Sequence, residues 1–319
     1  MLSRTADHLY WMARHMERAE NTARMLDVTS RMMLLPSSMK VPEQPWAAPW
    51  AVPLITTGLA SHYYALYSDL SAQNVLKFLV TDIDNPSSIC GSIFAARENA
   101  RSVRGAITSE MWESINATWI EFRNVSPQSL EAGQIGNFFD RVKLSSHMFR
   151  GVSVGTSLHD ESYHFIRLGT FLERADNTAR ILDVKYHILL PSPTDVGGAQ
   201  DYYQWGALLR SVSAFEAYRK IYRDVIVPLK VAQLLILRMD MPRSLHACMD
   251  EIHDILEILV GNTGTEARRM AGELHARLHY GRIEDIMTYG LHEYLTDFLE
   301  QTHRLGSHIN QSFFSHELQ

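Results

Sequence analysis

Cysteine is scarce in this chain, because only Cys90 and Cys248 occur among its 319 residues. Neither lies in a C-x-x-C pair or in the Cys/His spacing that is typical of a structural zinc site. Two isolated thiols do not provide the disulfide framework that stabilises small secreted domains. We therefore expect both thiols to be reduced and buried.

Long apolar runs and blocks of one charge are also missing. No stretch approaches the roughly 20 consecutive apolar residues that a membrane-spanning helix needs. The opening segment, Met1 to Arg24, contains Asp7, Glu17 and Glu20, unlike a secretory leader. The formal net charge is -6 and the basic residues are scattered among acidic ones, which argues against a dedicated nucleic-acid binder. We expect a soluble, cytoplasmic protein with no membrane or nucleic-acid partner.

The common signatures of catalysis and cofactor binding are absent as well. The sequence contains no G-x-S-x-G motif, no P-loop and no dinucleotide fingerprint. Among its 15 histidines, His275 and His279 have the i,i+4 spacing that places two metal ligands on one helix face. No H-E-x-x-H motif accompanies them, and abundant histidines produce such a pair by chance. We expect neither a metal site nor a cofactor.

The sequence does contain a copy of one of its own segments. Residues 17–28 read ERAENTARMLDV and residues 173–184 read ERADNTARILDV, so ten of the twelve positions are identical. The offset is 173 minus 17, or 156 residues, and twice this offset nearly accounts for the whole chain. This arithmetic predicts two tandem repeats, 1–156 and 157–319.

The repeated segment has the periodicity of a helix. Apolar side chains recur at steps of three and four through Leu9, Met12 and Met16, and Ala19 and Ala23 continue the stripe. Small residues at the centre of the stripe allow a second helix to approach closely. Strand-like alternation is nearly absent from the chain. We predict an all-α fold, a multi-helix bundle formed by two tandem, pseudo-symmetric repeats within a single domain, 1–319.

Further helices are predicted along both halves of the chain. Asn85-Pro86 and Met241-Pro242 have the pattern of helix starts, with proline in the first turn, where its missing N–H is harmless. The segments 36–53 and 190–198 are predicted to be extended connections. The predicted helices are 54–70, 86–105, 107–123, 128–150, 200–222, 225–238, 242–260, 264–278, 281–287 and 290–312.

Each copy of the repeated helix carries the same polar side chains. In the first copy they are Glu17, Arg18, Asn21 and Arg24, and in the second copy they are Glu173, Arg174, Asn177 and Arg180. One interpretation is an exposed ladder of ion pairs, although a solvated face has little reason to be so restricted in both copies. The others are a buried network across the interface between the repeats, or the lining of a cleft that binds a ligand.

A second polar group occurs only in the first half. It consists of Arg97, Glu98, Asn99, Arg101 and Arg104. Three arginines at spacings of four and three share one helical face, which suits an anion such as a phosphate or a C-terminal carboxylate. The alternative is a structural Arg-Glu network or a solvated helix face.

The paired motifs, the opening MLSRTADHLYWMARHMERAEN and the central NPSSI...ARENARSVR...MWESIN together resemble the bacterial alpha-E family over essentially the whole chain. The resemblance implies an α-helical domain with a Glu-Arg motif, here Glu17-Arg18 and Glu173-Arg174. Members of that family are typically encoded beside, or fused to, circularly permuted ATP-grasp proteins. The resemblance therefore implies a role in amide ligation or peptide modification, with an ATP-grasp partner supplying the ATP chemistry. Thr170 departs from the family pattern, in which Arg is frequent.

Three functions follow from these observations. The first is a non-catalytic helical accessory or binding subunit that docks an ATP-grasp ligase or presents its peptide or amino-acid substrate. The second is an enzyme of the same pathway that uses Glu17 or Glu173 for acid/base chemistry on an anionic or peptide substrate. The third is a purely structural protein whose helix faces become buried in a homo-oligomer. The missing catalytic motifs favour the first.

Overall fold

The computed structural model describes residues 1–33, 48–125, 134–188, 199–259 and 265–314. These residues form helices and connecting turns, and they contain no strand, which confirms the all-α fold class. The long helices are α1 (Ser3–Met32), α5 (Ile89–Ser102), α6 (Ser109–Phe122), α7 (Ile135–Thr156), α8 (Glu161–Ile188), α9 (Ala199–Ser211), α12 (Leu245–Leu259), α13 (Thr265–His279) and α15 (Leu291–Ile309). The short ones are α2 (Ala51–Thr56), α3 (Ala60–Leu66), α4 (Ala72–Leu76), α10 (Phe215–Tyr222), α11 (Pro228–Ile236) and α14 (Ile283–Tyr289), with π-helical segments η3 (Lys77–Thr81) and η6 (Asn310–Phe314).

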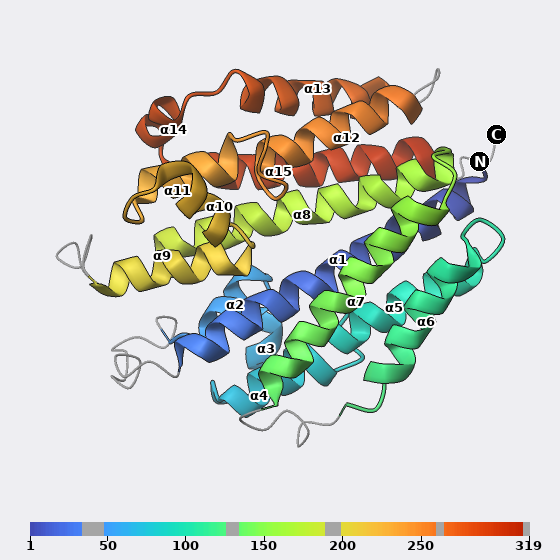
Figure 1. Ribbon diagram of the computed structural model, residues 1–319, viewed down its shortest axis with the longest axis horizontal. Coiled ribbons are helices and arrows are strands. Elements are labelled where there is room, and N and C mark those ends of the chain that lie inside the picture. The colour runs from blue at the N-terminus through green and yellow to red at the C-terminus, as the bar shows by residue number, and fades with distance from the viewer. Residues whose placement is uncertain (34–47, 126–133, 189–198, 260–264, 315–319) are drawn as a thin grey trace.

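Helices α1 and α8 lie side by side through the middle of the molecule (Figure 1). Helices α5, α6 and α7 gather on the side of α1, whereas α12, α13 and α15 gather on the side of α8. The last described segment, η6, returns to α1, where the rings of Phe314 and Tyr10 lie 5.1 Å apart. The two helices that carry the repeated motif therefore form the centre of the fold.

A glycine, rather than the predicted alanines, allows α1 and α8 to approach each other closely. Ala19 and Ala23 of α1 and Ala175 and Ala179 of α8 are all buried. Gly169 of α8 lies against the backbone of α1, because a β-carbon added there would be 2.3 Å from the carbonyl oxygen of Tyr10. The alanines of the predicted stripe belong to two different apolar clusters, Ala19 and Ala23 to one without any residue of α8, so the stripe does not mark the α1–α8 contact.

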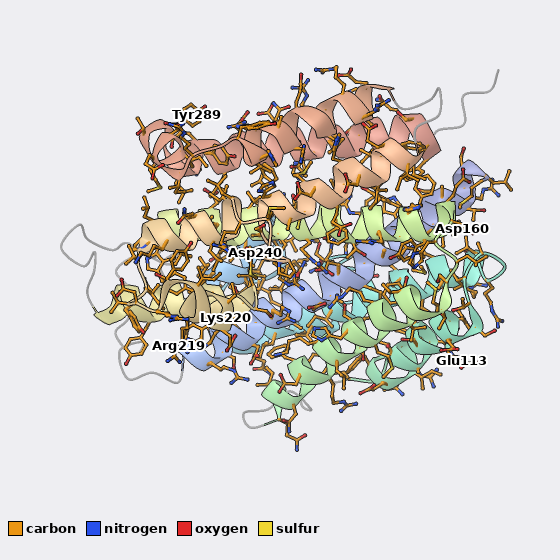
Figure 2. The ribbon with its side chains drawn as sticks, turned by 45° about the horizontal axis from the view of Figure 1, so that its top comes forward. Glu113, Asp160, Arg219, Lys220, Asp240 and Tyr289 are labelled. Atoms are coloured by element: carbon orange, nitrogen blue, oxygen red, sulfur yellow. The ribbon has the colours of Figure 1, made fainter. Side chains whose placement is uncertain are left out.

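Apolar side chains form two clusters, and the larger of them contains residues of both α1 and α8. The larger one joins α8 to α12, α13 and α15, and the smaller one packs α2, α3 and η3 against the end of α1. Charged side chains such as Glu113, Asp160 and Lys220 lie on the outside (Figure 2). None of the described helices is both long enough and apolar enough to cross a bilayer.

The predicted helix boundaries fail where the backbone takes a left-handed turn. The predicted helix 54–70 is divided into α2 and α3 at Gly58, and 200–222 is divided into α9 and α10 at Ser213, both with positive φ. The segment 72–81, for which no helix was predicted, is helical in α4 and η3. Of the predicted extended segments, 36–53 ends in helix α2 from Ala51, and 190–198 lies outside the described residues.

Serine rather than proline marks the start of two helices. The hydroxyl of Ser88 accepts from the N–H of Gly91 at 2.9 Å, and that of Ser244 accepts from Ala247 at 2.9 Å. Helices α5 and α12 therefore begin later than the predicted Pro86 and Pro242. Their first residues are 245 minus 89, or 156, apart, and the same offset separates the starts of α6 and α13 and of α7 and α15.

Candidate functional site

The two Glu-Arg motifs bind each other across the α1–α8 contact. Glu17 of α1 accepts from Nε and Nη2 of Arg174 at 3.0 Å each. Glu173 of α8 accepts from Nε and Nη2 of Arg18 at 2.6 and 2.9 Å. Each glutamate therefore forms a two-pronged ion pair with the arginine of the other motif, and the geometry is reciprocal.

Other arginines complete the coordination of both carboxylates. Glu17 is 1% exposed and also receives Arg150 of α7 at 2.9 Å and Arg243 at 3.0 Å. Glu173 is 7% exposed and also receives Nε of Arg14 at 2.8 Å. The interpretation of the motif as a buried, paired network, rather than an exposed ladder, therefore matches the observed contacts.

A second layer of acids flanks the motif. Glu20 is fully buried and pairs with Arg24 at 2.8 Å, with Arg243 at 2.7 Å, and closely with Arg150. Arg24 also lies 3.0 Å from Nε2 of His147.

The corresponding layer of α8 repeats these contacts. Asp176 pairs with Arg180 at 2.7 Å, and Arg180 lies 3.1 Å from Nε2 of His303. His303 stands 156 residues after His147, so the histidines follow the same offset as the motifs.

These side chains form one set with more cations than anions, which we name the Glu-Arg network. Its carboxylates are Glu17, Glu20, Glu173 and Asp176, and its arginines are Arg14, Arg18, Arg24, Arg150, Arg174, Arg180 and Arg243. Seven guanidinium groups minus four carboxylates leave an excess of three positive charges among the described residues. Such an excess favours anions at the margin of the network.

The arginines keep the buried glutamates ionised. Burial alone would raise the pKa of Glu17, but Arg174 and Arg243 outweigh burial and hold that pKa below its ordinary value. The same competition lowers the pKa of Glu173, where Arg18 and Arg14 overcome burial. The pKa of Glu20 is held well below its ordinary value against burial, chiefly by Arg243. These carboxylates hold no proton to donate near neutral pH.

A family model described as Alpha-E, a predicted α-helical domain with a conserved ER motif, matches residues 1–314. The chain belongs to the Alpha-E family. The ER motif of that description corresponds here to Glu17-Arg18 and Glu173-Arg174, the four side chains that pair reciprocally.

Curated relatives of this Alpha-E chain are longer proteins. The uncharacterised protein Mb2597 of Mycobacterium bovis and the uncharacterised protein Rv2567 of Mycobacterium tuberculosis are each 24% identical to it over 316 residues. The match covers 94% of this chain but only 35% of each relative. No solved structure gives a significant match.

The asparagines of the two Alpha-E motifs differ in their surroundings. Asn21 is buried and its Oδ1 accepts from Nη1 of Arg243 at 3.0 Å. Asn177 is only partly buried, and Ser87 stands 156 residues before Arg243, so no equivalent arginine exists for it. Thr170, which departs from the family pattern, is buried and donates to the carbonyl oxygen of Ile166 at 3.0 Å. The two halves of the network are therefore chemically unequal.

The predicted arginine face of α5 is divided among different partners. Arg101 pairs with Glu98 at 2.7 Å, and Arg97 pairs closely with the same carboxylate. Arg104 follows the end of α5 and lies over the ring of Trp112 at 4.8 Å. Asn99 contacts Nδ1 of His8 at 2.7 Å. These contacts resemble the structural Arg-Glu alternative more than three guanidinium groups converging on an anion.

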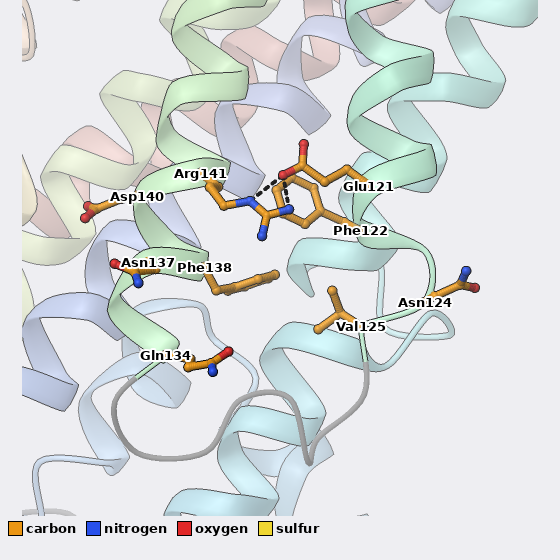
Figure 3. A pocket seen from close by; sticks show the side chains of 9 residues that line it. All are labelled: Glu121, Phe122, Asn124, Val125, Gln134, Asn137, Phe138, Asp140 and Arg141. Atoms are coloured by element: carbon orange, nitrogen blue, oxygen red, sulfur yellow. Dashed lines mark hydrogen bonds and ion pairs between the residues drawn. The ribbon is translucent and has the colours of Figure 1, made fainter.

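A hollow of about 680 Å³ lies between α6 and α7, away from every predicted site residue (Figure 3). Phe122, Val125 and Phe138 line it, and an ion pair between Glu121 and Arg141 crosses its edge. Residues 126–133, which connect its two walls, lie outside the described residues. We assign this hollow no function.

A smaller hollow, of about 370 Å³, borders the Glu-Arg network, and we name it the Gly306 pocket. Arg14, Asp176, His303 and Gly306 line it, together with side chains of α1, α8, α15 and η6. The residue 156 positions before Gly306 is Arg150, whose guanidinium group fills the space beside Glu17 in the first half. The pocket therefore exists where glycine replaces a long side chain.

Several members of the Glu-Arg network were not predicted from the sequence. Arg14, Arg150 and Arg243 carry no motif, because their pairing with Glu17 and Glu173 arises only when distant helices pack together. His147 and His303 were detectable in principle, since both lie at the offset of 156 within otherwise diverged segments.

Proposed function

We propose that this chain is a non-catalytic helical accessory subunit that acts with a circularly permuted ATP-grasp protein in amide ligation or peptide modification in the cytoplasm. The observation that carries the proposal is the closure of the Glu-Arg network. Both motif glutamates are buried and bonded to several arginines, so neither carboxylate has a free oxygen edge for a substrate proton. Chemistry supplied by a partner accounts for a chain that lacks catalytic motifs.

We also propose that two tandem, pseudo-symmetric repeats, 1–156 and 157–319, built this scaffold. The recurring helix starts and the reciprocal Glu17–Arg174 and Glu173–Arg18 pairs support this origin. A shared backbone bond gives further support, because Thr178 donates to the carbonyl oxygen of Arg243 and Thr22 donates to that of Ser87. The two repeats differ at Gly306, because the first repeat has Arg150 at the corresponding position.

The Gly306 pocket is the place we propose for the amino-acid or peptide substrate. Its volume lies within the range of small-molecule sites. Arg14 presents positive charge and Asp176 negative charge on its walls, which suits a ligand that carries both a carboxylate and an ammonium group. The excess of arginine in the adjoining network favours the carboxylate end.

Co-purification of the tagged chain with a circularly permuted ATP-grasp protein of the same organism tests the partnership. ATP turnover by that protein is then measured with and without the chain. We expect a stable complex and a several-fold change in turnover. Failure to form a complex, together with unchanged turnover, would overturn the proposal. Amide or peptide turnover by the isolated chain, lost in Glu173→Gln, would instead favour the enzyme alternative.

The pocket is tested separately with Gly306→Leu. A β-carbon at Gly306 meets only Leu172 Cδ2, at 3.5 Å, so leucine extends into the pocket without moving the backbone. Gly155→Leu on α7 is the matched control, because a β-carbon there meets nothing within 4 Å. We expect Gly306→Leu to keep the partner but lose the substrate-dependent change in turnover. Equal turnover in both variants would exclude the pocket as the substrate site.

A further inference from the structure

Four metal-binding side chains face one another between α12 and α13. His246 and Asp250 stand at i,i+4 on α12, and His275 and His279 stand at i,i+4 on α13. One ligand nitrogen from each of the three histidines lies within 4.8 Å of the others. Oδ1 of Asp250 lies 2.9 Å from Nε2 of His275 and 3.3 Å from Nε2 of His246.

The hydrogen bonding of His246 leaves its Nε2 atom without a partner. Its Nδ1 lies 2.8 Å from the carbonyl oxygen of Leu237, and a carbonyl oxygen accepts, so Nδ1 carries the proton. In the neutral ring Nε2 is then an acceptor, and it faces the carboxylate of Asp250, which is also an acceptor. His246 is only 5% exposed, and neither its Nε2 nor Oδ1 of Asp250 has a hydrogen-bond partner among the described residues.

Nε2 of His246 and Oδ1 of Asp250 are acceptors that cannot satisfy each other, and a cation between them would satisfy both. Two further imidazole rings stand beside that of His246, with centroids at 5.4 Å for His279 and 6.2 Å for His275. Neutral imidazole is the form that binds a metal ion.

We propose that His246, His275, His279 and Asp250 form a binding site for a first-row divalent metal ion, with Zn²⁺ the best match. Three imidazoles and one carboxylate suit zinc better than the oxygen-seeking Mg²⁺ or Ca²⁺. Tetrahedral zinc requires ligand nitrogens roughly 3.4 Å apart. Because His279 is exposed, its rotation can close the remaining distance.

The surroundings of the ligands have the features of a metal site. The carbonyl oxygen of Leu237 fixes the ring of His246 so that Nε2 points inward, as outer-shell acceptors do for metal-bound histidine. His253 stacks on His275 with centroids 4.8 Å apart and an angle of 9° between the rings. Exposed His279 leaves a path by which the ion enters.

The corresponding positions in the first half show that the fold does not require this polar group. The residues 156 positions before Asp250 and His275 are Phe94 and Trp119, whose rings lie 5.1 Å apart between α5 and α6. Cys90 stands at the position that corresponds to His246. An apolar contact serves that helix pair, whereas its counterpart carries four ligands.

Calorimetric titration of the metal-free full chain with ZnCl₂ tests the site. We expect one Zn²⁺ per chain and at least a tenfold weaker affinity in His279→Ala and in His275→Ala. The matched control is His62→Ala, because His62 is an exposed histidine on α3. His279 is also exposed, so its removal does not endanger folding.

Titration with Co²⁺ provides a readout of geometry, since a tetrahedral site gives intense visible absorption. We expect this absorption in the parent chain and in His62→Ala, and its loss in His279→Ala. Absence of saturable Zn²⁺ binding, or equal affinity in His62→Ala and His279→Ala, would overturn the proposal.

Discussion

At the scale of single residues, the buried carboxylates of the Glu-Arg network differ from surface acids, because their burial is tolerated only when arginines balance their charge. Transferring Glu17 and Glu20 from water is unfavourable unless their charges are matched, and each contacts at least three cationic side chains. Removing one member therefore leaves the others buried without a counter-charge. We therefore expect that substituting these residues chiefly lowers the free energy of unfolding.

Glu20→Ala tests this expectation. The fully buried Glu20 binds Arg24, Arg150 and Arg243, so its loss should lower the free energy of unfolding by about 3–5 kcal/mol. Urea unfolding measures the change. Glu257→Ala is the matched control, because its partner Arg268 is exposed and such pairs contribute little. Similar losses in both variants would contradict the importance of burial.

The depressed pKa values of the buried glutamates predict that the fold loses stability in acid. Glu17, Glu20 and Glu173 have folded-state pKa values below the ordinary 4.5, so their ionisation stabilises the fold above that pH. This stabilisation is lost progressively as the pH falls from about 4.5 through the folded-state pKa values. Urea unfolding between pH 7 and pH 3 should show a steep decline, and Glu17→Gln should show a shallower one. A stability that does not change over this range would contradict the assignment.

At the scale of helices, the contact between α1 and α8 depends on the absence of side chains. Gly169 of α8 lies against the backbone of Tyr10 in α1. This approach brings Glu17 within reach of Arg174 and Glu173 within reach of Arg18. Packing at the glycine and pairing in the network are therefore linked.

Gly169→Ala should separate the two helices slightly. A β-carbon there would lie 2.3 Å from the carbonyl oxygen of Tyr10, which is backbone and does not move away easily. We expect a loss of about 1–3 kcal/mol in the free energy of unfolding. Gly151→Ala on α7 meets no neighbour within 4 Å and should instead stabilise by about 0.5–1 kcal/mol. Thermal unfolding of both variants decides, and an equal gain in both would refute the close contact.

The same helices show which structural features could be predicted from sequence patterns and which could not. The 3–4 periodicity identified α1 and α8, because it follows from local geometry, whereas the alanine stripe did not mark their mutual contact. The break at Ser213 was missed because serine does not signal a left-handed turn, whereas the break at Gly58 stands at a residue type that does. Arg150 and Arg243 were missed as partners because only tertiary packing brings them to Glu17. Asp250 and His246 were likewise missed as neighbours of His275 and His279, because only the packing of α12 against α13 brings the four side chains together.

At the scale of the whole molecule, the central helices belong to different halves of the chain. α1 packs on α8 as extensively as on its own neighbours α5 and α7. Each half therefore presents the two charges of its Glu-Arg motif to the other. A single cooperative unit, rather than two separable domains, is the expected behaviour.

Separate expression of residues 1–156 and 157–319 tests this unity. Either fragment alone would expose the buried face of its central helix and leave Glu17 or Glu173 without the arginine of the other motif. We expect neither fragment to give a cooperative thermal transition, and mixing the two to restore one. Cooperative unfolding of an isolated fragment, followed by circular dichroism, would show that the halves are independent domains.

The most direct test of the account is the coupling energy between Glu17 and Arg174. Urea unfolding of the parent chain, Glu17→Gln, Arg174→Met and the double variant forms a complete cycle. Because the two side chains share two hydrogen bonds of 3.0 Å and are both buried, we predict a favourable coupling of about 1.5 kcal/mol or more. A coupling near zero would contradict the claim that the two Glu-Arg motifs hold the central helices together.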